Sequence, residues 1–346
     1  MKKRFNMKKY SKAYLYAAAI GVLLIVGLCY HYLLSGLSKE ETTVYLYIDS
    51  DDTADSVFAK LQPIAKTPAL NALRTLARHS DYGSNVRTGR YAIKPGEGAL
   101  RVWHHLKNGQ QEAMNLTIPE VRTMDRLAGV LGRKLMMDSL TLAEALTDPE
   151  FCARYDADTA TIVCLFIPNT YNVYWDTTLD ELMDRMRREH DDFWTPERRQ
   201  KADAMGLTTD EVQTLASIVD EETNNLEEKH IIAGLYYNRL QKGMPLQACP
   251  TIKFAWKRFD LRRLYDKLLS INSPYNTYRN PGLPPGPIKI ASIKGIDAVL
   301  DYTKSDYLFM CAKDDFSGRH AFAATGEEHM ANARRYAQAL NERGIK

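Results

Sequence analysis

The strongest hydrophobic pattern is an apolar run near the N-terminus. Residues 13–34 contain no Asp, Glu, Lys or Arg and consist mainly of Ala, Leu, Ile, Val, Gly and Tyr. A helix rises about 1.5 Å per residue, so a run of this length spans the roughly 30 Å hydrocarbon core of a bilayer. The pattern therefore predicts a transmembrane helix over residues 13–34.

The segment before this run, residues 1–12, carries six Lys or Arg side chains and no acidic one. Because positive flanks stay on the cytoplasmic side, we expect a cytoplasmic N-terminal tail and a catalytic or binding region outside the inner membrane, on the periplasmic side. A cleaved signal peptide is the alternative. The apolar run exceeds the usual h-region of about 7–15 residues, and residues 35–38 form a weak cleavage site, so we favour an uncleaved anchor.

Three segments after the anchor follow one approximate pattern. Residues 48–61, 93–106 and 118–131 each begin with Ile and continue with a turn and matched apolar positions, which is typical of strand, turn and helix. We expect strands beginning near Val44, Gly89 and Met114 to pair in one small sheet covered by helices. This module, over residues 40–135, resembles the LysM-like modules of cell-wall proteins. It would either contact glycan or act as a spacer.

A later helix places a carboxylate on an apolar stripe. Leu215, Ile218, Val219 and Glu222 follow i, i+3, i+4, i+7 spacing, whereas the intervening Asp220 and Glu221 point elsewhere. Desolvation raises the pKa of a carboxyl group, so Glu222 is a candidate general acid. The alternative is a helix end at which Glu222 turns to water.

Helices and stiff loops surround this segment. Residues 136–199 are predicted to be helical apart from a loop at 166–174, and helices are also expected at 227–242 and 327–343. The loop at 273–288 contains five of the chain's fourteen prolines, which restrict its conformation and suit a preformed groove wall. A rigid turn around a core would use similar residues.

Charge and cofactor motifs narrow the classes of function. The whole chain has 46 basic and 43 acidic residues, so the part outside the N-terminal tail has 40 against 43, and no basic nucleic-acid surface is indicated. No P-loop and no HExxH motif occurs, and we expect neither a metal nor a cofactor. The histidines have no ligand spacing and are interpreted as structural or surface residues: His230, His320 and His329.

Four cysteines follow the anchor, without CxxC spacing. Disulfides are permitted outside the cytosol, but a chain of this size does not need them, and the sequence leaves pairing open. The four residues are Cys152, Cys164, Cys249 and Cys311.

Several motifs together resemble one enzyme family. They occupy residues 215–223, 237–240, 243–251, 275–278 and 282–286, and their order and spacing are similar to those of the endolytic murein transglycosylases, or YceG-like proteins. The resemblance covers nearly the whole chain, the anchor included.

The resemblance assigns the catalytic carboxylate to Glu222. In the family motif the first glutamate falls on Asp220 and the lysine on Glu221, so neither of those two family residues is retained. Cys249 stands where an Asp is common, which puts in doubt a supporting carboxylate in that loop. Val121 replaces a common Gly and affects only a turn.

The resemblance implies a lytic transglycosylase with an α+β catalytic domain over residues 136–346. It would cleave the bond between N-acetylmuramic acid and N-acetylglucosamine and leave 1,6-anhydro ends. Glu222 would act first as acid and then as base, because the sugar supplies its own 6-hydroxyl. The expected substrate-binding residues are Gln247, Thr251, Asn276 and Tyr278, whereas Asn238 and Arg239 could as easily buttress the site as contact substrate.

The expected partners are peptidoglycan strands, the membrane and peptidoglycan synthases. Two alternatives remain open at this point: a hydrolytic muramidase, in which water attacks the sugar, and a non-enzymatic wall-binding scaffold. Exposure of Glu222 with an ordinary pKa would favour the scaffold.

Overall fold

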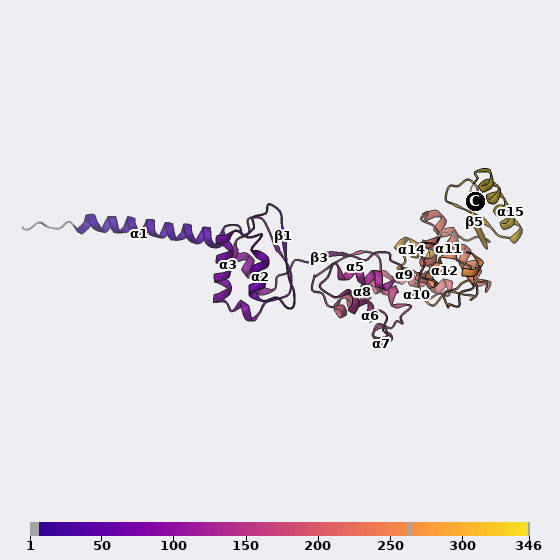
Figure 1. The fold of residues 1–346 in the computed structure, drawn as a ribbon, viewed down its shortest axis with the longest axis horizontal. Helices are drawn as coiled ribbons and strands as arrows, with labels where there is room; N and C mark the ends of the chain where they lie inside the picture. Colours follow the sequence, from indigo (N-terminus) through magenta and orange to yellow (C-terminus); the bar gives the residue numbers. More distant parts are fainter. Residues whose placement is uncertain (1–6, 262–264, 345–346) are drawn as a thin grey trace, which may run out of the picture. The chain divides into compact units, whose positions relative to one another are not determined.

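The computed structural model describes residues 7–261 and 265–344, so the first half of the expected basic tail lies outside the described residues. The backbone contacts divide the chain into two compact units. Unit 1 comprises Met1–Asn115 and Asn172–Thr177, and unit 2 comprises Leu116–Tyr171 and Thr178–Lys346. Helices and short strands occur in both, so the chain has a mixed α+β fold (Figure 1).

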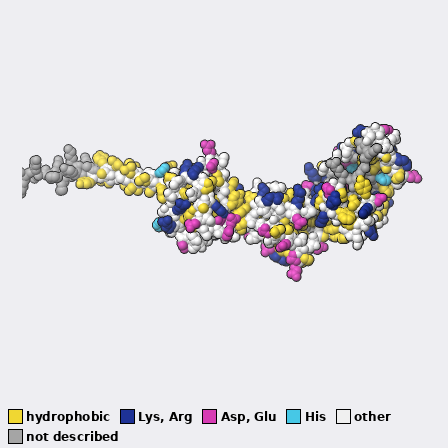
Figure 2. Space-filling model, in the orientation of Figure 1, with side chains coloured by type: hydrophobic (Ala, Val, Ile, Leu, Met, Phe, Trp, Pro, Cys, Tyr) yellow, Lys and Arg dark blue, Asp and Glu magenta, His cyan; other side chains and the backbone are white. Residues whose placement is uncertain are grey.

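The apolar run forms a helix, as predicted. Helix α1 (Met7–Cys29) continues into the π-helical turn η1 (Tyr30–Leu34). Residues Tyr14–Leu34 are long and apolar enough to cross a membrane, and none of this span is buried within the protein. Figure 2 shows the hydrophobic side chains along this helix, whereas charged side chains are spread over the rest of the visible face. This helix is consistent with a single-pass membrane protein.

Unit 1 has the order strand, helix, helix, strand, helix. Strand β1 pairs antiparallel with β2, from Val44 opposite Ile93 to Ile48 opposite Gly89. The first helix begins at a capping box in which Thr53 and Ser56 exchange hydrogen bonds. The elements are β1 (Val44–Ile48), α2 (Ala54–Leu61), α3 (Thr67–His79), η2 (Tyr82–Ser84), β2 (Gly89–Ile93) and α4 (Ala99–Asn108).

The predicted three-stranded sheet is wrong. Strand β3 (Met114–Thr117) pairs with β4 (Thr170–Val173), not with β1 and β2. Strand β4 lies within residues 166–174, a segment that the sequence predicted to be a loop. The repeat pattern describes each strand and its following helix, but the partner of a strand is a long-range choice that the pattern does not contain. The contact division accordingly falls near residue 115, whereas the sequence predicts a boundary near 135.

Unit 2 is mainly helical. The expected helices at 227–242 and 327–343 correspond to α11 and α15. Its core surrounds α10, which packs against α11, α12 and α14. The helices up to and including α10 are α5 (Met124–Gly132), α6 (Ser139–Ala145), α7 (Pro149–Ala153), η3 (Ile162–Leu165), α8 (Leu179–Phe193), α9 (Pro196–Met205) and α10 (Thr209–Glu222). The later elements are α11 (Leu226–Gln241), α12 (Cys249–Ala255), α13 (Asp266–Leu269), α14 (Ile293–Leu300), β5 (Phe309–Ala312), β6 (His320–Ala323) and α15 (Gly326–Glu342).

The cysteines are free thiols. Cys152 and Cys164 are buried, whereas Cys249 is exposed and Cys311 is partly exposed. Burial raises the pKa of the Cys164 thiol well above its usual range, so this side chain packs as a neutral apolar group.

Candidate active site

Helix α10 carries the candidate acid at its last position. A capping box between Thr208 and Glu211 fixes its start, and the predicted apolar stripe is confirmed because Leu215, Ile218 and Val219 are fully buried. The burial extends beyond that stripe, since every residue from Val212 to Asp220 is buried. The helical wheel, which assumed a single apolar face, therefore underestimated how many residues of this central helix are buried.

Asp220 is more deeply buried than the wheel indicated. Its carboxylate pairs with the buried Lys229 ammonium of α11. It also accepts hydrogen bonds from Ser292 at the start of α14, from the backbone N–H at 2.6 Å and from Oγ at 2.8 Å. The absence of Cβ at Gly295 makes room for it, because an added Cβ would lie 2.5 Å from Asp220 Oδ1. Asp220 thus joins three helices behind the site.

Glu222 lies two residues beyond Asp220, on a different side of α10, and faces a pocket. Its side chain is partly exposed, so the alternative in which the helix end turns it fully to water is not supported. The Tyr236 hydroxyl donates a hydrogen bond of 2.8 Å to Glu222 Oε1. Burial raises the pKa of Glu222, as predicted, and the Tyr236 hydrogen bond partly opposes that rise. Glu222 is therefore suited to hold a proton, and it is paired with a neutral donor.

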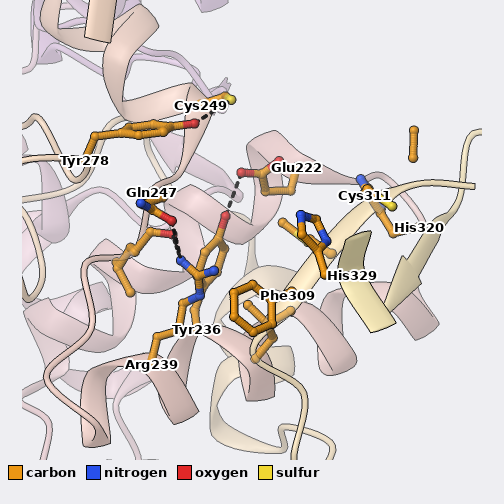
Figure 3. A pocket seen from close by; sticks show the side chains of 14 residues that line it. Glu222, Tyr236, Arg239, Gln247, Cys249, Tyr278, Phe309, Cys311, His320 and His329 are labelled. Carbon is orange, nitrogen blue, oxygen red and sulfur yellow. Dashed lines mark hydrogen bonds between the residues drawn. The ribbon is translucent and has the colours of Figure 1, made fainter. Parts of the chain in front are cut away.

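The pocket has a volume of about 480 Å³ and contains one carboxylate (Figure 3). Glu222 is the sole Asp or Glu among the described residues that line it. The other walls come from α11, the start of α12 and the loop before it, the 273–288 loop, strands β5 and β6, and α15. The lining side chains outside α10 are Leu235, Tyr236, Arg239, Leu246, Gln247, Cys249, Tyr278, Phe309, Met310, Cys311, Ala312, His320 and His329.

Arg239 organises one wall of the pocket. Its guanidinium donates to the carbonyl oxygens of Pro245 and Leu246 at 3.0 and 3.1 Å and to Gln247 Oε1 at 3.2 Å. Its Nε donates to Leu308 O at 2.6 Å, just before β5. The sequence left the role of Arg239 between buttress and substrate contact. Because its guanidinium donates to these four acceptors, Arg239 serves as a buttress of the site. Its bond to Gln247 holds the exposed Gln247 side chain in the pocket.

The other expected binding residues fall into two groups. The structure brings Gln247 and Tyr278 into the pocket with Glu222, and the Tyr278 hydroxyl lies 3.1 Å from Cys249 Sγ. Thr251 and Asn276 are fully buried, so the expectation that these two contact substrate is wrong. The Asn276 amide donates to the carbonyls of Leu269 and Ile271, and such contacts hold the loop that presents Tyr278.

His320 and His329 line the pocket, although the sequence predicted both to be structural or surface residues. His320 receives support from Glu228, whose Oε1 accepts the His320 backbone N–H at 2.7 Å and whose Oε2 lies 3.4 Å from His320 Nδ1. Glu228 Oε2 also accepts from Thr223, the residue after Glu222. His329 stacks on Phe309. No local pattern marks these positions, because their strands and helix approach α10 through tertiary packing.

Among residues 7–261 and 265–344, no group of three or more His, Cys, Asp or Glu side chains is placed to hold an ion. The chemistry available in the pocket is proton transfer by Glu222, hydrogen bonding by Gln247 and Tyr278, and contact with the aromatic face of Phe309.

Comparisons with known proteins identify the same family as the motifs. The model of the YceG-like family matches residues 46–335. An endolytic murein transglycosylase from Bacillus subtilis is 28% identical over 342 residues, which cover 92% of this chain and 93% of that protein. One from Streptococcus pneumoniae is 30% identical over 287 residues, which cover 74% of this chain and 51% of the longer relative. The crystal structure of a yceG-like protein from Listeria monocytogenes matches with a TM-score of 0.54 and 25% identity, over 84% of this chain and 99% of that one.

Proposed function

This chain belongs to the YceG-like family, and we propose that it is a membrane-anchored lytic transglycosylase that cleaves peptidoglycan. The observation that carries the proposal is the lone carboxylate of the pocket. Glycosidases that use water or form a covalent intermediate normally need two carboxyl groups, one as acid and one as base or nucleophile. A single carboxyl with a raised pKa suffices when the substrate provides its own nucleophile.

In the proposed reaction, protonated Glu222 donates its proton to the glycosidic oxygen between N-acetylmuramic acid and N-acetylglucosamine. The bond from C1 of the muramic acid to that oxygen breaks, and the N-acetylglucosamine end leaves as an alcohol. The Glu222 carboxylate then accepts the proton of the 6-hydroxyl, whose oxygen bonds to C1 and closes the 1,6-anhydro ring. Glu222 ends the cycle protonated, and no water is consumed.

Tyr236 assists the proton-donating half of this cycle. Its hydroxyl donates to Glu222 Oε1 and stabilises the carboxylate that forms after the first proton transfer. We assign substrate contacts to Gln247 and Tyr278, which face the pocket from two adjacent, hydrogen-bonded loops, and retain Thr251 and Asn276 as supports of those loops.

The remaining regions are assigned by the same proposal. The order of strands and helices in unit 1 supports a LysM-like module, which would contact glycan or position unit 2. The basic residues before the anchor support an orientation with the N-terminus in the cytoplasm and both units outside. There the enzyme would cut nascent strands, endolytically, beside peptidoglycan synthases. The functional division at residues 40–135 and 136–346 stays a proposal.

Mass spectrometry of digested peptidoglycan tests the reaction. The full-length protein in detergent should release fragments with 1,6-anhydro ends, which are one water lighter than hydrolysis products. Glu222→Gln should lose at least about 100-fold in rate, the lower bound for a well-placed general acid. Glu221→Gln is the matched control, since Glu221 is on the same helix and pairs with Arg122 instead.

Each other result has a defined meaning. Reducing ends in place of anhydro ends would identify a hydrolytic muramidase. Full activity of Glu222→Gln would refute the assignment of the acid. Binding of peptidoglycan without cleavage by the native protein would favour a wall-binding scaffold.

A further inference from the structure

The end of the membrane helix is part of the folded core of unit 1. Leu37, three residues after the candidate span, is fully buried. Its backbone N–H donates to Glu97 O at 2.7 Å, and its carbonyl accepts from Lys66 N at 2.8 Å. The chain therefore passes from the span to the core through Ser35 and Gly36 alone, and no flexible linker separates them.

Helix α4 begins directly against the end of the span. Gly36 and Gly98 form an isolated antiparallel bridge. A Cβ added to Gly98 would lie 2.7 Å from the carbonyl oxygen of Leu34, so the backbone approach at this point requires glycine. The first turn of α4 consequently lies beside Leu34, at the end of the span.

A second side-chain stripe runs along α4. Ala99, Val102 and Leu106 face the core, and all three are buried. The stripe beside this face, at i, i+3, i+4 and i+7, consists of Leu100, Trp103, His104 and Lys107, of which Trp103 is half-buried and also packs against the core. We call these four residues the outer stripe. Leu100 is 38% exposed. The Lys107 ammonium lies 4.9 Å from the centre of the Trp103 ring.

The outer stripe borders a mainly apolar hollow. This cavity has a volume of about 540 Å³, and its walls include Leu34, Leu100 and Trp103. Leu34 belongs to the candidate span, so the hollow continues the apolar surface of the anchor. A surface of this kind, continuous with a segment that crosses lipid, needs an apolar neighbour outside the protein.

The length of the span sets the position of this surface. The 21 residues of Tyr14–Leu34 rise about 31 Å as a helix, which matches the hydrocarbon thickness. Leu34 then lies at the boundary between acyl chains and headgroups, and so does the start of α4. Trp residues concentrate at this boundary, and Lys and Arg side chains extend from it to lipid phosphates.

We propose that the outer stripe of α4 lies in the lipid interface of the membrane that α1 crosses, with phospholipid filling the hollow beside Leu34. Leu100 and Trp103 contact acyl chains near the headgroups. The exposed Lys107 side chain faces lipid phosphates, and so does Arg101, whose Nε also pairs with Glu97 Oε1 at 3.2 Å. Unit 1 thereby rests on the bilayer in a fixed orientation, a role distinct from the catalytic chemistry of unit 2.

Fluorescence quenching in vesicles tests this contact. The chain has four tryptophans, none of them in the span. The full-length protein is reconstituted in phosphatidylcholine and phosphatidylglycerol with bromine atoms high on the acyl chains. We expect its emission to be quenched relative to unbrominated vesicles, and Trp103→Phe to lose most of that quenching. Trp256→Phe is the matched control, because Trp256 is 42% exposed and lies in unit 2.

A second pair of variants guards against misfolding of Trp103→Phe, which loses the hydrogen bond from Trp103 Nε1 to Ser80 Oγ. Leu100→Glu should reduce the quenching of Trp103, whereas Leu140→Glu, at a 71% exposed position of unit 2, should leave it unchanged. Equal quenching in the native protein and Trp103→Phe would overturn the proposal. Quenching that falls as the protein-to-lipid ratio rises would also overturn it, since a second copy would then cover the stripe.

Discussion

The Tyr236 hydroxyl of α11 donates a 2.8 Å hydrogen bond to Glu222 at the end of α10, and this bond couples a neutral phenol to the one carboxyl group of the pocket. Burial raises the pKa of Glu222, and the Tyr236 bond lowers it. Burial likewise raises the pKa of Tyr236 well above its usual range, so the phenol remains a donor throughout the working pH range.

Removal of this donor should shift the pH profile of the enzyme. In Tyr236→Phe the ionised form of Glu222 loses a hydrogen bond, so the pKa of Glu222 rises. A hydrogen bond to a charged group is worth about 1.5–3 kcal/mol, which corresponds to a shift of about one to two pH units. The alkaline limb of kcat/KM should move upward by that amount, and kcat should fall because Glu222 with a higher pKa is a weaker proton donor.

The adjacent tyrosine provides the control for this measurement. Tyr237 donates to Met205 O at 2.9 Å, outside the pocket, so Tyr237→Phe should keep the native alkaline limb. An unshifted limb in Tyr236→Phe would mean that another group titrates in that range.

Replacement of the Glu222 carboxyl should stabilise the fold at neutral pH. The pKa of Glu222 is higher in the folded state than in the unfolded state, so its stabilising contribution is complete below the unfolded value of about 4.3 and is lost as pH rises through the folded value. Glutamine stays neutral at every pH. Glu222→Gln should therefore melt at a higher temperature than the native protein at pH 7–8 and at the same temperature near pH 4. A lower melting temperature of Glu222→Gln than of the native protein at pH 7–8 would contradict the claim that burying the ionised Glu222 destabilises the fold.

The buried ion pair behind the site should carry a large share of the stability. Lys229→Ala leaves the Asp220 carboxylate buried without its cation, and we expect the free energy of unfolding to fall by about 3–5 kcal/mol in denaturant titration. The control is Lys201→Ala at the exposed pair with Asp301, where the expected loss is below about 1 kcal/mol. Similar losses in the two variants would show that solvent reaches Asp220.

A methyl group at Gly295 should disturb the same carboxylate. The added Cβ of Gly295→Ala would lie 2.5 Å from Asp220 Oδ1, so either Asp220 or the start of α14 must shift. We expect lower stability and lower kcat, because Asp220 is two residues from Glu222. Gly326→Ala is the control, since nothing lies within 4 Å of its Cβ and Ala favours helix by up to about 1 kcal/mol. Unchanged kcat in Gly295→Ala would show that the contact between α14 and Asp220 does not position Glu222.

The sequence identified what depends on local periodicity. The apolar span, the stripe of α10 and the inward position of Glu222 follow from helical spacing within a few residues. Tyr236 lies fourteen positions beyond Glu222 on another helix, and its direction depends on how α10 and α11 cross. His320 reaches the pocket from β6, almost a hundred residues away. Such approaches arise from tertiary packing, which no single local pattern contains.

The same distinction explains the errors. The pairing of β3 with β4 joins segments more than fifty residues apart, and the repeat that predicted β3 gave no information on its partner. Thr251 and Asn276 have the side-chain chemistry of sugar-binding residues, but their hydrogen bonds are used within the loops. The residue types correctly predicted polar side chains at these positions. Tertiary packing determines whether such a side chain faces the pocket or is buried in the protein.

The burial of Leu37 has a consequence for how this anchor can be altered. A typical tether tolerates insertions and deletions because no packed residue depends on its length. Here a single added residue between Leu34 and Leu37 would withdraw Leu37 from the core or separate Gly36 from Gly98. The distance between the bilayer and the first folded module is therefore set by core packing, and changing that distance would require rebuilding the module itself.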